Sequence, residues 1–217
     1  MSSNKKQYNP FPGLFPYVLD QSNNFFAREK EVESILEILQ NNRLVTISSN
    51  AGTGKSSIIN AGIIPRLING FPGQCGREWA ICKFRPGISP ITNICTALVN
   101  KGTLYNNKKA KSTDFDEYLK VFEKEGELSL MKIYENSDIY ENKNLLIVID
   151  QIEDLFIYNK FFDHENSDDD NLLIDIIYKT IKTKGIAIYC IINVQTPYVA
   201  NLNLYGQFSE LLSSSQY

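Results

Sequence analysis

The 217-residue sequence has no apolar run long enough to cross a bilayer, and its N-terminus, MSSNKKQYNP, lacks the apolar core of a secretory signal. We therefore expect a cytoplasmic protein with no membrane partner. An excess of basic residues is also missing, because 22 Lys and Arg stand against 25 Asp and Glu, which gives a net charge of −3. This balance gives no indication of nucleic acid as an obligatory partner.

Residues that often hold metals or form disulfides are few and scattered. The only histidine, His164, lies in an acidic loop at 163–171, where a solvated side chain is far more common than a catalytic one. The four cysteines, which show no CxxC spacing, are Cys75, Cys82, Cys95 and Cys190. Cys82 and Cys190 lie inside apolar runs, so we expect reduced structural thiols rather than disulfides or metal ligands.

Apolar, β-branched runs alternate with segments of helical periodicity along most of the chain. The runs predict buried strands at 44–47, 79–84, 145–150 and 186–194. The periodic segments predict helices at 28–40, 58–64, 90–100, 114–125, 152–158, 172–184 and 201–213. Pro65 should kink or end the second of these helices. Such alternation is typical of an α/β fold, and we expect a mostly parallel central sheet flanked by helices.

The first 27 residues differ from the rest, because the sequence NPFPGLFPY is dense in proline and aromatic side chains. Proline fixes φ and removes an N–H donor, which excludes a regular helix or a central strand here. We expect residues 1–27 to form an extended segment and residues 28–217 to form the main domain. The aromatic rings of Phe11, Phe15 and Tyr17 should fill a groove on that domain.

The stretch LVTISSNAGTGKSSIIN carries a phosphate-binding pattern between the first strand and the next helix. Gly54, Lys55 and Ser56 satisfy the end of GxxxxGK[ST], whereas Ser49 stands where the pattern has its first glycine. The candidate nucleotide-binding residues are Asn50, Ala51, Gly52, Thr53, Gly54, Lys55, Ser56 and Ser57. Glycine allows successive N–H groups to face an anion at a helix N-terminus. The alternative is a glycine-rich turn that only joins a strand to a helix.

Within this loop we expect Lys55 to contact the β- and γ-phosphates as a catalytic point charge and the Ser56 hydroxyl to ligate Mg²⁺. Asp150 follows a buried strand and is the candidate second metal ligand, because ligands bind where parallel strands end. Its alternative role is to cap the following helix. Glu153 or Asp154 could orient or deprotonate a water, with Glu153 preferred, but either could equally be a favourable acid in a first helical turn.

The expected cofactors are ATP or ADP with Mg²⁺. A guanine site would use Asn-Lys-x-Asp after a late strand, and the segment Asn142-Lys143-Asn144-Leu145 does not supply the aspartate. A small-molecule kinase would also use a phosphate loop, but nothing in the sequence marks an acceptor pocket.

Five segments of the chain together resemble the NTPase domain of the first class of novel STAND proteins, which are signal-transduction ATPases with numerous domains. In chain order they are NPFPGLFPY, FFAREKEVESIL, SSNAGTGKSSIINAGIIPRL, Trp79 with Arg85-Pro86-Gly87, and LLIVIDQIEDLF. The resemblance covers nearly the whole chain and implies a three-layer P-loop NTPase. It also implies a switch in which ADP holds a closed form and a trigger allows ATP exchange and oligomerisation.

The resemblance further implies roles for single residues. FFAREKE is similar to a hydrophobic-Gly-Arg-Glu motif, with Ala27 in place of the glycine, which implies that Arg28 binds near the nucleotide. DQIEDLF is similar to DQFEELF, which implies Asp150 at the metal and Glu153 near the attacking water. The implied partners are further copies of the chain and sensor or effector domains, in bacterial signalling or antiviral defence.

Two features depart from the family pattern. After the last strand that pattern resembles LRADFY, with an arginine that senses the γ-phosphate, whereas this chain reads VQTPYV with Gln195 and Pro197. A neutral glutamine lacks the charge and the donor fork of arginine, so we expect weaker hydrolysis or sensing. The chain also ends at Tyr217 without a winged-helix lid. We therefore expect a C-terminally truncated domain, either a fragment or a naturally minimal protein.

Two functional hypotheses follow. The leading one is an ATP-binding signalling switch domain with slow or residual hydrolysis. The alternative is a degenerate, non-hydrolysing module that binds nucleotide weakly or acts only in protein interaction. A conventional ATPase that acts on DNA is a third idea, against which the net charge of −3 argues.

Overall fold

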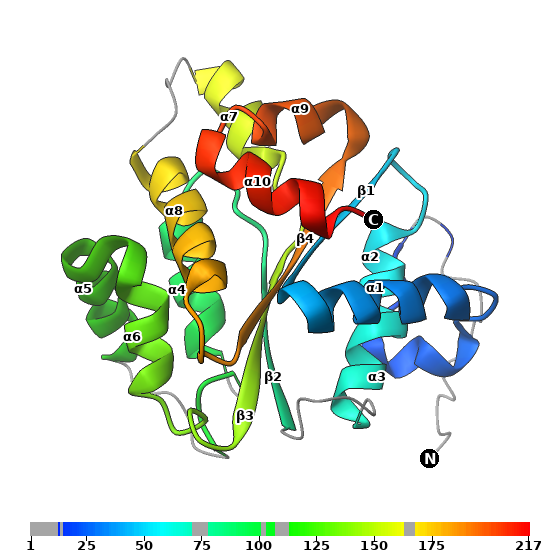
Figure 1. Cartoon of the computed structure of the whole chain (residues 1–217), viewed down its shortest axis with the longest axis horizontal. Coiled ribbons are helices and arrows are strands. Elements are labelled where there is room, and N and C mark those ends of the chain that lie inside the picture. Colours follow the sequence, from blue (N-terminus) through cyan, green and yellow to red (C-terminus); the bar gives the residue numbers. More distant parts are fainter. Residues whose placement is uncertain (1–12, 14, 71–77, 101–102, 107–112, 163–167) are drawn as a thin grey trace, which may run out of the picture.

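Four parallel strands form the centre of the computed structural model, in the order β1-β4-β3-β2 (Figure 1). The structure describes residues 13, 15–70, 78–100, 103–106, 113–162 and 168–217. The strands are β1 (Leu44–Ser49), β2 (Glu78–Phe84), β3 (Lys143–Ile149) and β4 (Ile188–Gln195). The last strand of the chain thus lies between the first and the third, and the prediction of a parallel α/β sheet is confirmed.

Helices cover both faces of this sheet and one of its ends (Figure 1). The α-helices are α1 (Glu29–Asn42), α2 (Lys55–Ser57), α3 (Ile64–Ile68), α4 (Pro90–Val99), α5 (Asp114–Glu125), α6 (Ser129–Glu135), α7 (Asp154–Phe162), α8 (Asp168–Lys182), α9 (Val199–Leu202) and α10 (Gly206–Ser215). Shorter elements are η1 (Leu19–Asn24), η2 (Ile58–Ile63), η3 (Gly126–Leu128) and η4 (Thr196–Tyr198). The described helices therefore give a three-layer arrangement.

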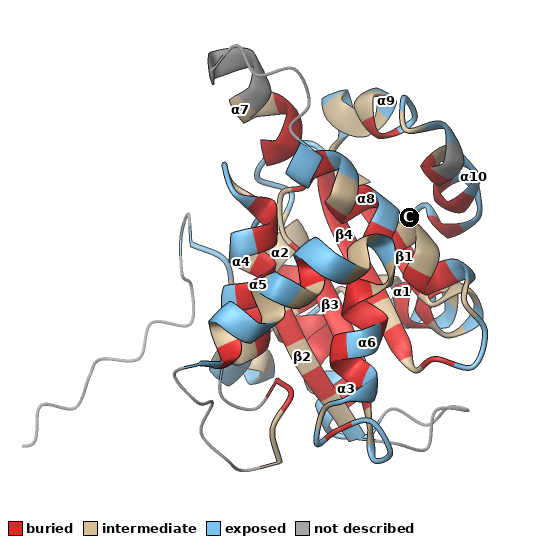
Figure 2. Ribbon diagram, turned by 90° about the vertical axis from the view of Figure 1, so that its left-hand side faces the viewer, coloured by how far each residue is buried: buried red, intermediate tan, exposed pale blue. Residues whose placement is uncertain are grey.

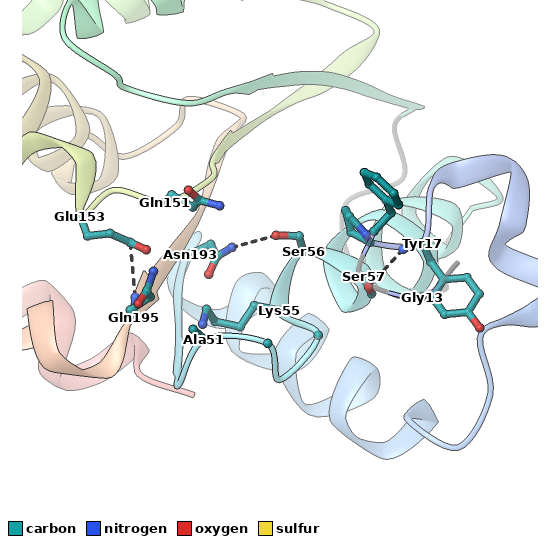
Figure 3. Close-up of a pocket in the computed structure, with 14 residues that line it drawn as sticks. Gly13, Tyr17, Ala51, Lys55, Ser56, Ser57, Gln151, Glu153, Asn193 and Gln195 are labelled. Atoms are coloured by element: carbon teal, nitrogen blue, oxygen red, sulfur yellow. Dashed lines mark hydrogen bonds between the residues drawn. The ribbon is translucent and has the colours of Figure 1, made fainter. Parts of the chain in front are cut away.

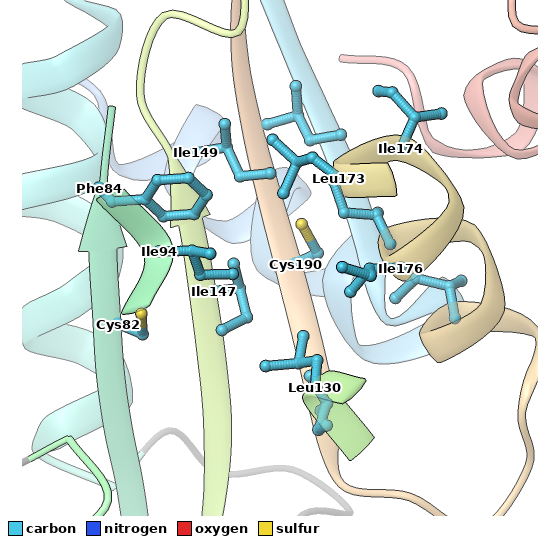
Figure 4. Packing of buried hydrophobic residues seen from close by; sticks show 14 of the residues in the cluster. Cys82, Phe84, Ile94, Leu130, Ile147, Ile149, Leu173, Ile174, Ile176 and Cys190 are labelled. Carbon is cyan, nitrogen blue, oxygen red and sulfur yellow. The ribbon is translucent and has the colours of Figure 1, made fainter. Parts of the chain in front are cut away.

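The apolar run of β3 is continuous because both faces of the strand are buried (Figure 2). Leu145, Ile147 and Ile149 belong to the core cluster that includes α4 and α8, part of which appears in Figure 4. Leu146 and Val148 belong to the opposite cluster, which includes α1 and η2. Successive strand residues point to opposite faces, so one strand contributes to two cores.

Some element boundaries differ from the sequence prediction. The helical segment after the phosphate loop does not end at Pro65. The π-helix η2 is followed directly by α3, which includes Pro65 and ends at Ile68. Proline lies in the first turn of α3, where its missing N–H is tolerated. The predicted helix at 201–213 is divided into α9 and α10, and α8 begins earlier than predicted, at Asp168. Aspartates are favourable in a first helical turn.

The N-terminal segment is also less extended than predicted, because residues 19–24 form the 3-10 helix η1. Cys82, Cys95 and Cys190 are free and buried, as expected. Cys75, His164, Phe11 and most of the basic loop at 101–112 lie outside the described residues. In the part of the chain that is described, no helix combines the length and apolar character needed to cross a membrane.

Gly62 lies in η2 at a close contact with α1, where a larger side chain has no room. A Cβ atom at this position would lie 2.6 Å from Val32 Cγ2 and 3.2 Å from Phe25 Cε1. We expect Gly62→Ala to lower the free energy of unfolding by about 1–3 kcal/mol through overpacking, measured by urea denaturation. Gly206→Ala is the control, since nothing lies within 4 Å of its Cβ position.

If overpacking is the cause, Gly62→Ala should lower the free energy of unfolding less in a Val32→Ala background than in the unaltered protein, because Val32 Cγ2 is then absent. An equal loss in both backgrounds would contradict this explanation.

Candidate functional site

An open cavity of about 660 Å³ lies beyond the carboxyl ends of β1, β3 and β4 (Figure 3). It is lined by Gly13, Phe15, Pro16, Tyr17, Ala51, Gly52, Gly54, Lys55, Ser56, Ser57, Gln151, Glu153, Asn193 and Gln195. These residues come from the N-terminal segment, the phosphate loop, the loop after β3 and the end of β4. Ligands of parallel α/β sheets bind at this edge, and the volume is in the usual range for a ligand site.

The backbone of the phosphate loop explains why its departure from the sequence pattern is tolerated. The φ angles of Gly52 and Gly54 are +78° and +88°, in the left-handed region where other side chains are strained. Ser49 instead ends β1 in extended backbone, which any residue can adopt. Glycine is therefore present at the two positions of the loop that require it, and the position held by Ser49 does not.

Lys55 begins α2, and its ammonium folds back over the loop. Nζ donates to the carbonyl oxygens of Ser49 at 2.8 Å and Asn50 at 3.0 Å. Burial lowers the pKa of Lys55, and the carboxylates of Glu153 and Asp150 act in the opposite direction. The ammonium thus shares one electrostatic environment with both carboxylates, and its bonds to neutral carbonyls can be exchanged for stronger ones to phosphate oxygens.

Asp150 is joined to the phosphate loop by hydrogen bonds. Its Oδ1 accepts from Ser56 Oγ at 3.1 Å and from Asn193 Nδ2 at 2.5 Å, and its Oδ2 pairs with Lys83 Nζ at 3.0 Å. Helix α7 begins only at Asp154. Because the Asp150 carboxylate is engaged with groups from three other elements, the capping role considered from the sequence is not observed.

Sequence reasoning missed Asn193 and Lys83. Asn193 is a buried amide on β4, and its Nδ2 also lies 3.3 Å from Ser56 Oγ. Lys83 on β2 connects Asp150 to Asn60, whose Oδ1 lies 2.7 Å from Nζ. The only available signal was a polar side chain within an apolar strand, in IYCIINVQ and in WAICKF.

Glu153 lies in the cavity wall and is 1% exposed. Its Oε2 accepts from the Gln195 N–H at 3.3 Å, whereas its buried Oε1 has no hydrogen-bond partner among the described residues. Burial raises the pKa of Glu153, and hydrogen bonds from its own backbone and from Gln195 oppose this. A carboxylate with a free oxygen and a raised pKa is suited to orienting or deprotonating a water.

Asp154 is also 1% exposed, but both of its oxygens are occupied. Arg85 Nε donates to Oδ2 at 2.5 Å and Nη2 donates to Oδ1 at 2.8 Å, and the Gly87 N–H lies 3.3 Å from Oδ2. The Arg85-Pro86-Gly87 segment therefore holds Asp154 in place. Of the two acids considered from the sequence, only Glu153 has a carboxylate oxygen without a hydrogen-bond partner among the described residues.

Arg28 contacts the phosphate loop at Thr53 but does not line the cavity. Its Nη1 donates to the Thr53 carbonyl at 3.2 Å, and its Nε pairs with Glu31 Oε1 at 2.6 Å. The preceding Ala27 has a φ of +66°, a conformation that favours glycine, which is the residue of the resembling motif. Ala27 therefore adopts a backbone conformation that a glycine would adopt with less strain.

The remaining loop residues have separate surroundings. Ala51 lines the cavity, whereas Asn50 and Thr53 do not, and Thr53 Oγ1 donates to the Asn50 carbonyl at 2.9 Å. The Ser49 and Thr53 hydroxyls contact each other. The Ser57 hydroxyl accepts from the Tyr17 N–H at 3.1 Å, so it faces the N-terminal segment.

A parallel sheet with this phosphate loop after β1 and a carboxylate after β3 defines an α/β P-loop nucleotide-binding domain. The model of the family described as Novel STAND NTPase 1 matches residues 10–217, and the chain belongs to that family. The fold is similar to that of the ORC2 protein of Aeropyrum pernix in ADPNP–ADP complexes, with a TM-score of 0.53 and 14% identity. That match covers 89% of this chain and 48% of the ORC2 chain. A search of curated proteins found no match.

Removing Arg85 would leave the buried Asp154 carboxylate without its guanidinium. We expect Arg85→Ala to lower the free energy of unfolding by about 2–4 kcal/mol, measured by urea denaturation. Lys132→Ala is the matched control because it removes an exposed pair with Glu135, which is worth about 0.5 kcal/mol or less. Equal effects of the two substitutions would show that the Arg85–Asp154 pair does not stabilise the fold.

Proposed function

We propose that this NTPase domain is an ATP-binding signalling switch that binds Mg-ATP and ADP and hydrolyses ATP slowly. The observation that carries the proposal is the hydrogen bond of 3.1 Å between Ser56 and Asp150. It joins the phosphate loop to a carboxylate from another strand, beside a cavity of suitable size. A glycine-rich turn that merely connects a strand to a helix needs no such partner.

Ser56 and Asp150 are suited to Mg²⁺, which prefers oxygen ligands and is usually held by one or two carboxylates with phosphates and waters. Ser56 Oγ and Asp150 Oδ1 are already neighbours, at 3.1 Å. We assign the metal to these two residues. Mg²⁺ held by these residues would supply positive charge that offsets the charge of the bound phosphates. The loop N–H groups and Lys55 would hold the same phosphates, with Arg28 supporting the loop at Thr53.

Glu153 is the proposed group that orients the attacking water, because it lines the cavity and its Oε1 has no hydrogen-bond partner among the described residues. Lys55 would stabilise the negative charge of the transferring phosphoryl group. Gln195 lines the same cavity but is neutral, and it hydrogen-bonds to Glu153, with its backbone N–H 3.3 Å from Oε2. Without a guanidinium at this position the transition state gains less charge stabilisation, which supports slow hydrolysis.

A switch also needs partners that respond to the bound nucleotide. We propose further copies of the chain and sensor or effector proteins in this role, on the basis of the family alone. The second candidate function is a non-hydrolysing nucleotide-binding module, which the neutral Gln195 favours. The similarity to ORC2 concerns the fold alone and adds no support for action on DNA.

Lys55→Ala should weaken ATP and ADP binding by about 10- to 100-fold, because charge-assisted hydrogen bonds to the phosphates are lost. The measurement is calorimetry with Mg²⁺ and either nucleotide. Lys120→Ala removes an exposed lysine on α5 and should change neither affinity. Absence of nucleotide binding by the unaltered protein would refute the switch proposal, and unchanged affinity in Lys55→Ala would refute the role of Lys55.

Glu153→Gln should slow phosphate release by about 10²–10⁴-fold in single-turnover assays while ATP still binds. Glu123→Gln, an exposed acid on α5, is the control. Retained phosphate release would exclude Glu153 as the group that acts on water. Absence of release from the unaltered protein, with ATP bound, would select the non-hydrolysing module.

The same substitution should change the pH dependence of stability. Burial raises the pKa of Glu153, so the folded state binds this proton more tightly than the unfolded chain does. Ionised Glu153 therefore destabilises the fold, and Glu153→Gln should raise the free energy of unfolding at neutral pH. This gain should vanish below the ordinary glutamate pKa of 4.5, as measured by urea unfolding across pH without nucleotide. A gain that is independent of pH would contradict this cause.

A further inference from the structure

The N-terminal segment lines the same cavity as the phosphate loop, through Gly13, Phe15, Pro16 and Tyr17. We propose that this segment is the nucleobase wall of the nucleotide site and that the base stacks on the ring of Phe15. The inference rests on the proposed function, since it concerns the base of the nucleotide whose phosphates the loop would bind. It assigns a ligand-binding role to a segment that the sequence indicated only as filling a groove.

Hydrogen bonds fix the segment to the helix that follows the phosphate loop. The Tyr17 N–H donates to Ser57 Oγ at 3.1 Å (Figure 3). Asn60 Nδ2 donates to the Tyr17 carbonyl at 3.2 Å. The Tyr17 ring also packs edge-on against Phe25, with 5.7 Å between ring centroids. Ser57 directly follows the candidate metal ligand Ser56, so the segment is held at a fixed position relative to the phosphate site.

Phe15 is 78% exposed although it lines this cavity. A phenyl ring has neither a hydrogen-bond donor nor a positive charge for a phosphate, but a flat, weakly polar base can stack on its face. The Tyr17 ring packs against Phe25, so Phe15 is the aromatic ring of this wall that has no such ring contact among the described residues, beside the apolar Pro16. Phosphate-binding groups and an exposed aromatic ring in one cavity match the two chemical halves of a nucleotide.

Stacking of a base on an aromatic ring tolerates any base, because every base has a π-face. Phe15 therefore contributes affinity rather than a choice between adenine and guanine. Its removal should weaken ATP and GTP to a similar degree and should not affect a ligand that has phosphates but no base. Inorganic tripolyphosphate is such a ligand, and it separates the nucleobase wall from the phosphate loop.

The test is calorimetry with Mg²⁺, using ATP and tripolyphosphate against the unaltered chain, Phe15→Ala and Phe15→Tyr. We expect Phe15→Ala to weaken ATP by about 5- to 150-fold and tripolyphosphate by less than about twofold, whereas Phe15→Tyr keeps the affinity for ATP. Leu204→Ala, at a residue that is 81% exposed and does not line the cavity, should change neither affinity.

Three outcomes would overturn the inference. If the unaltered chain binds ATP no more tightly than tripolyphosphate, the base has no subsite, although the phosphate site stands. If Phe15→Ala weakens both ligands equally, or neither of them, Phe15 is not the stacking ring. If neither ligand binds the unaltered chain, the proposed function fails together with the nucleobase wall.

A spectroscopic readout follows from the single tryptophan, Trp79, which packs against Tyr189 with ring centroids 4.8 Å apart. Trp79→Phe keeps a ring at that contact, and Phe15→Trp in this background places the only indole in the cavity. ATP should quench its fluorescence by stacking, whereas tripolyphosphate should not. Unchanged fluorescence at saturating ATP would overturn the stacking assignment even where ATP binds.

Discussion

The hydrogen bonds among Ser56, Asp150 and Asn193 are the interaction on which the rest of the site depends. Because β4 lies between β1 and β3, the phosphate loop and the carboxylate after β3 do not come from adjacent strands. Asn193, on the intervening strand, bridges them by donating to Asp150 at 2.5 Å, with its Nδ2 3.3 Å from Ser56 Oγ. A buried amide in the middle strand thus sets the spacing between the two proposed metal ligands.

Local patterns in the sequence were sufficient for the strands, the turn between β1 and α2 and the position of Asp150 after β3, because each depends on neighbouring residues. The partners of these residues were not predictable in the same way. Asn193 and Lys83 have no fixed spacing from the loop, and the position of β4 beside β1 depends on the whole sheet. The different surroundings of Glu153 and Asp154 were not predictable either, because Asp154 is bound by Arg85, which is distant from it in the sequence.

The π-helix η2 illustrates a further limit of local prediction. Pro65 alone predicts an end or a kink, whereas the chain changes its hydrogen-bonding register one turn earlier and stays helical. The same stretch includes Gly62, which lets α1 approach closely, and Asn60, which holds Tyr17. This short irregular turn thus contributes the close packing against α1, the attachment of the N-terminal segment and the helical backbone that continues through Pro65.

Binding and hydrolysis are supported unequally by this arrangement. Groups suited to phosphate and Mg²⁺ are present, with Ser56 Oγ 3.1 Å from Asp150 Oδ1, and Ser49 lies in extended backbone that does not require glycine. The groups that would act on the γ-phosphate are less complete, because Gln195 lines the cavity without a charge. Replacing a charged group by a neutral one lowers transition-state stabilisation more than ground-state binding. This composition is the physical basis of the proposed slow hydrolysis, and long residence of a bound nucleotide is what the proposed nucleotide-controlled switch would require.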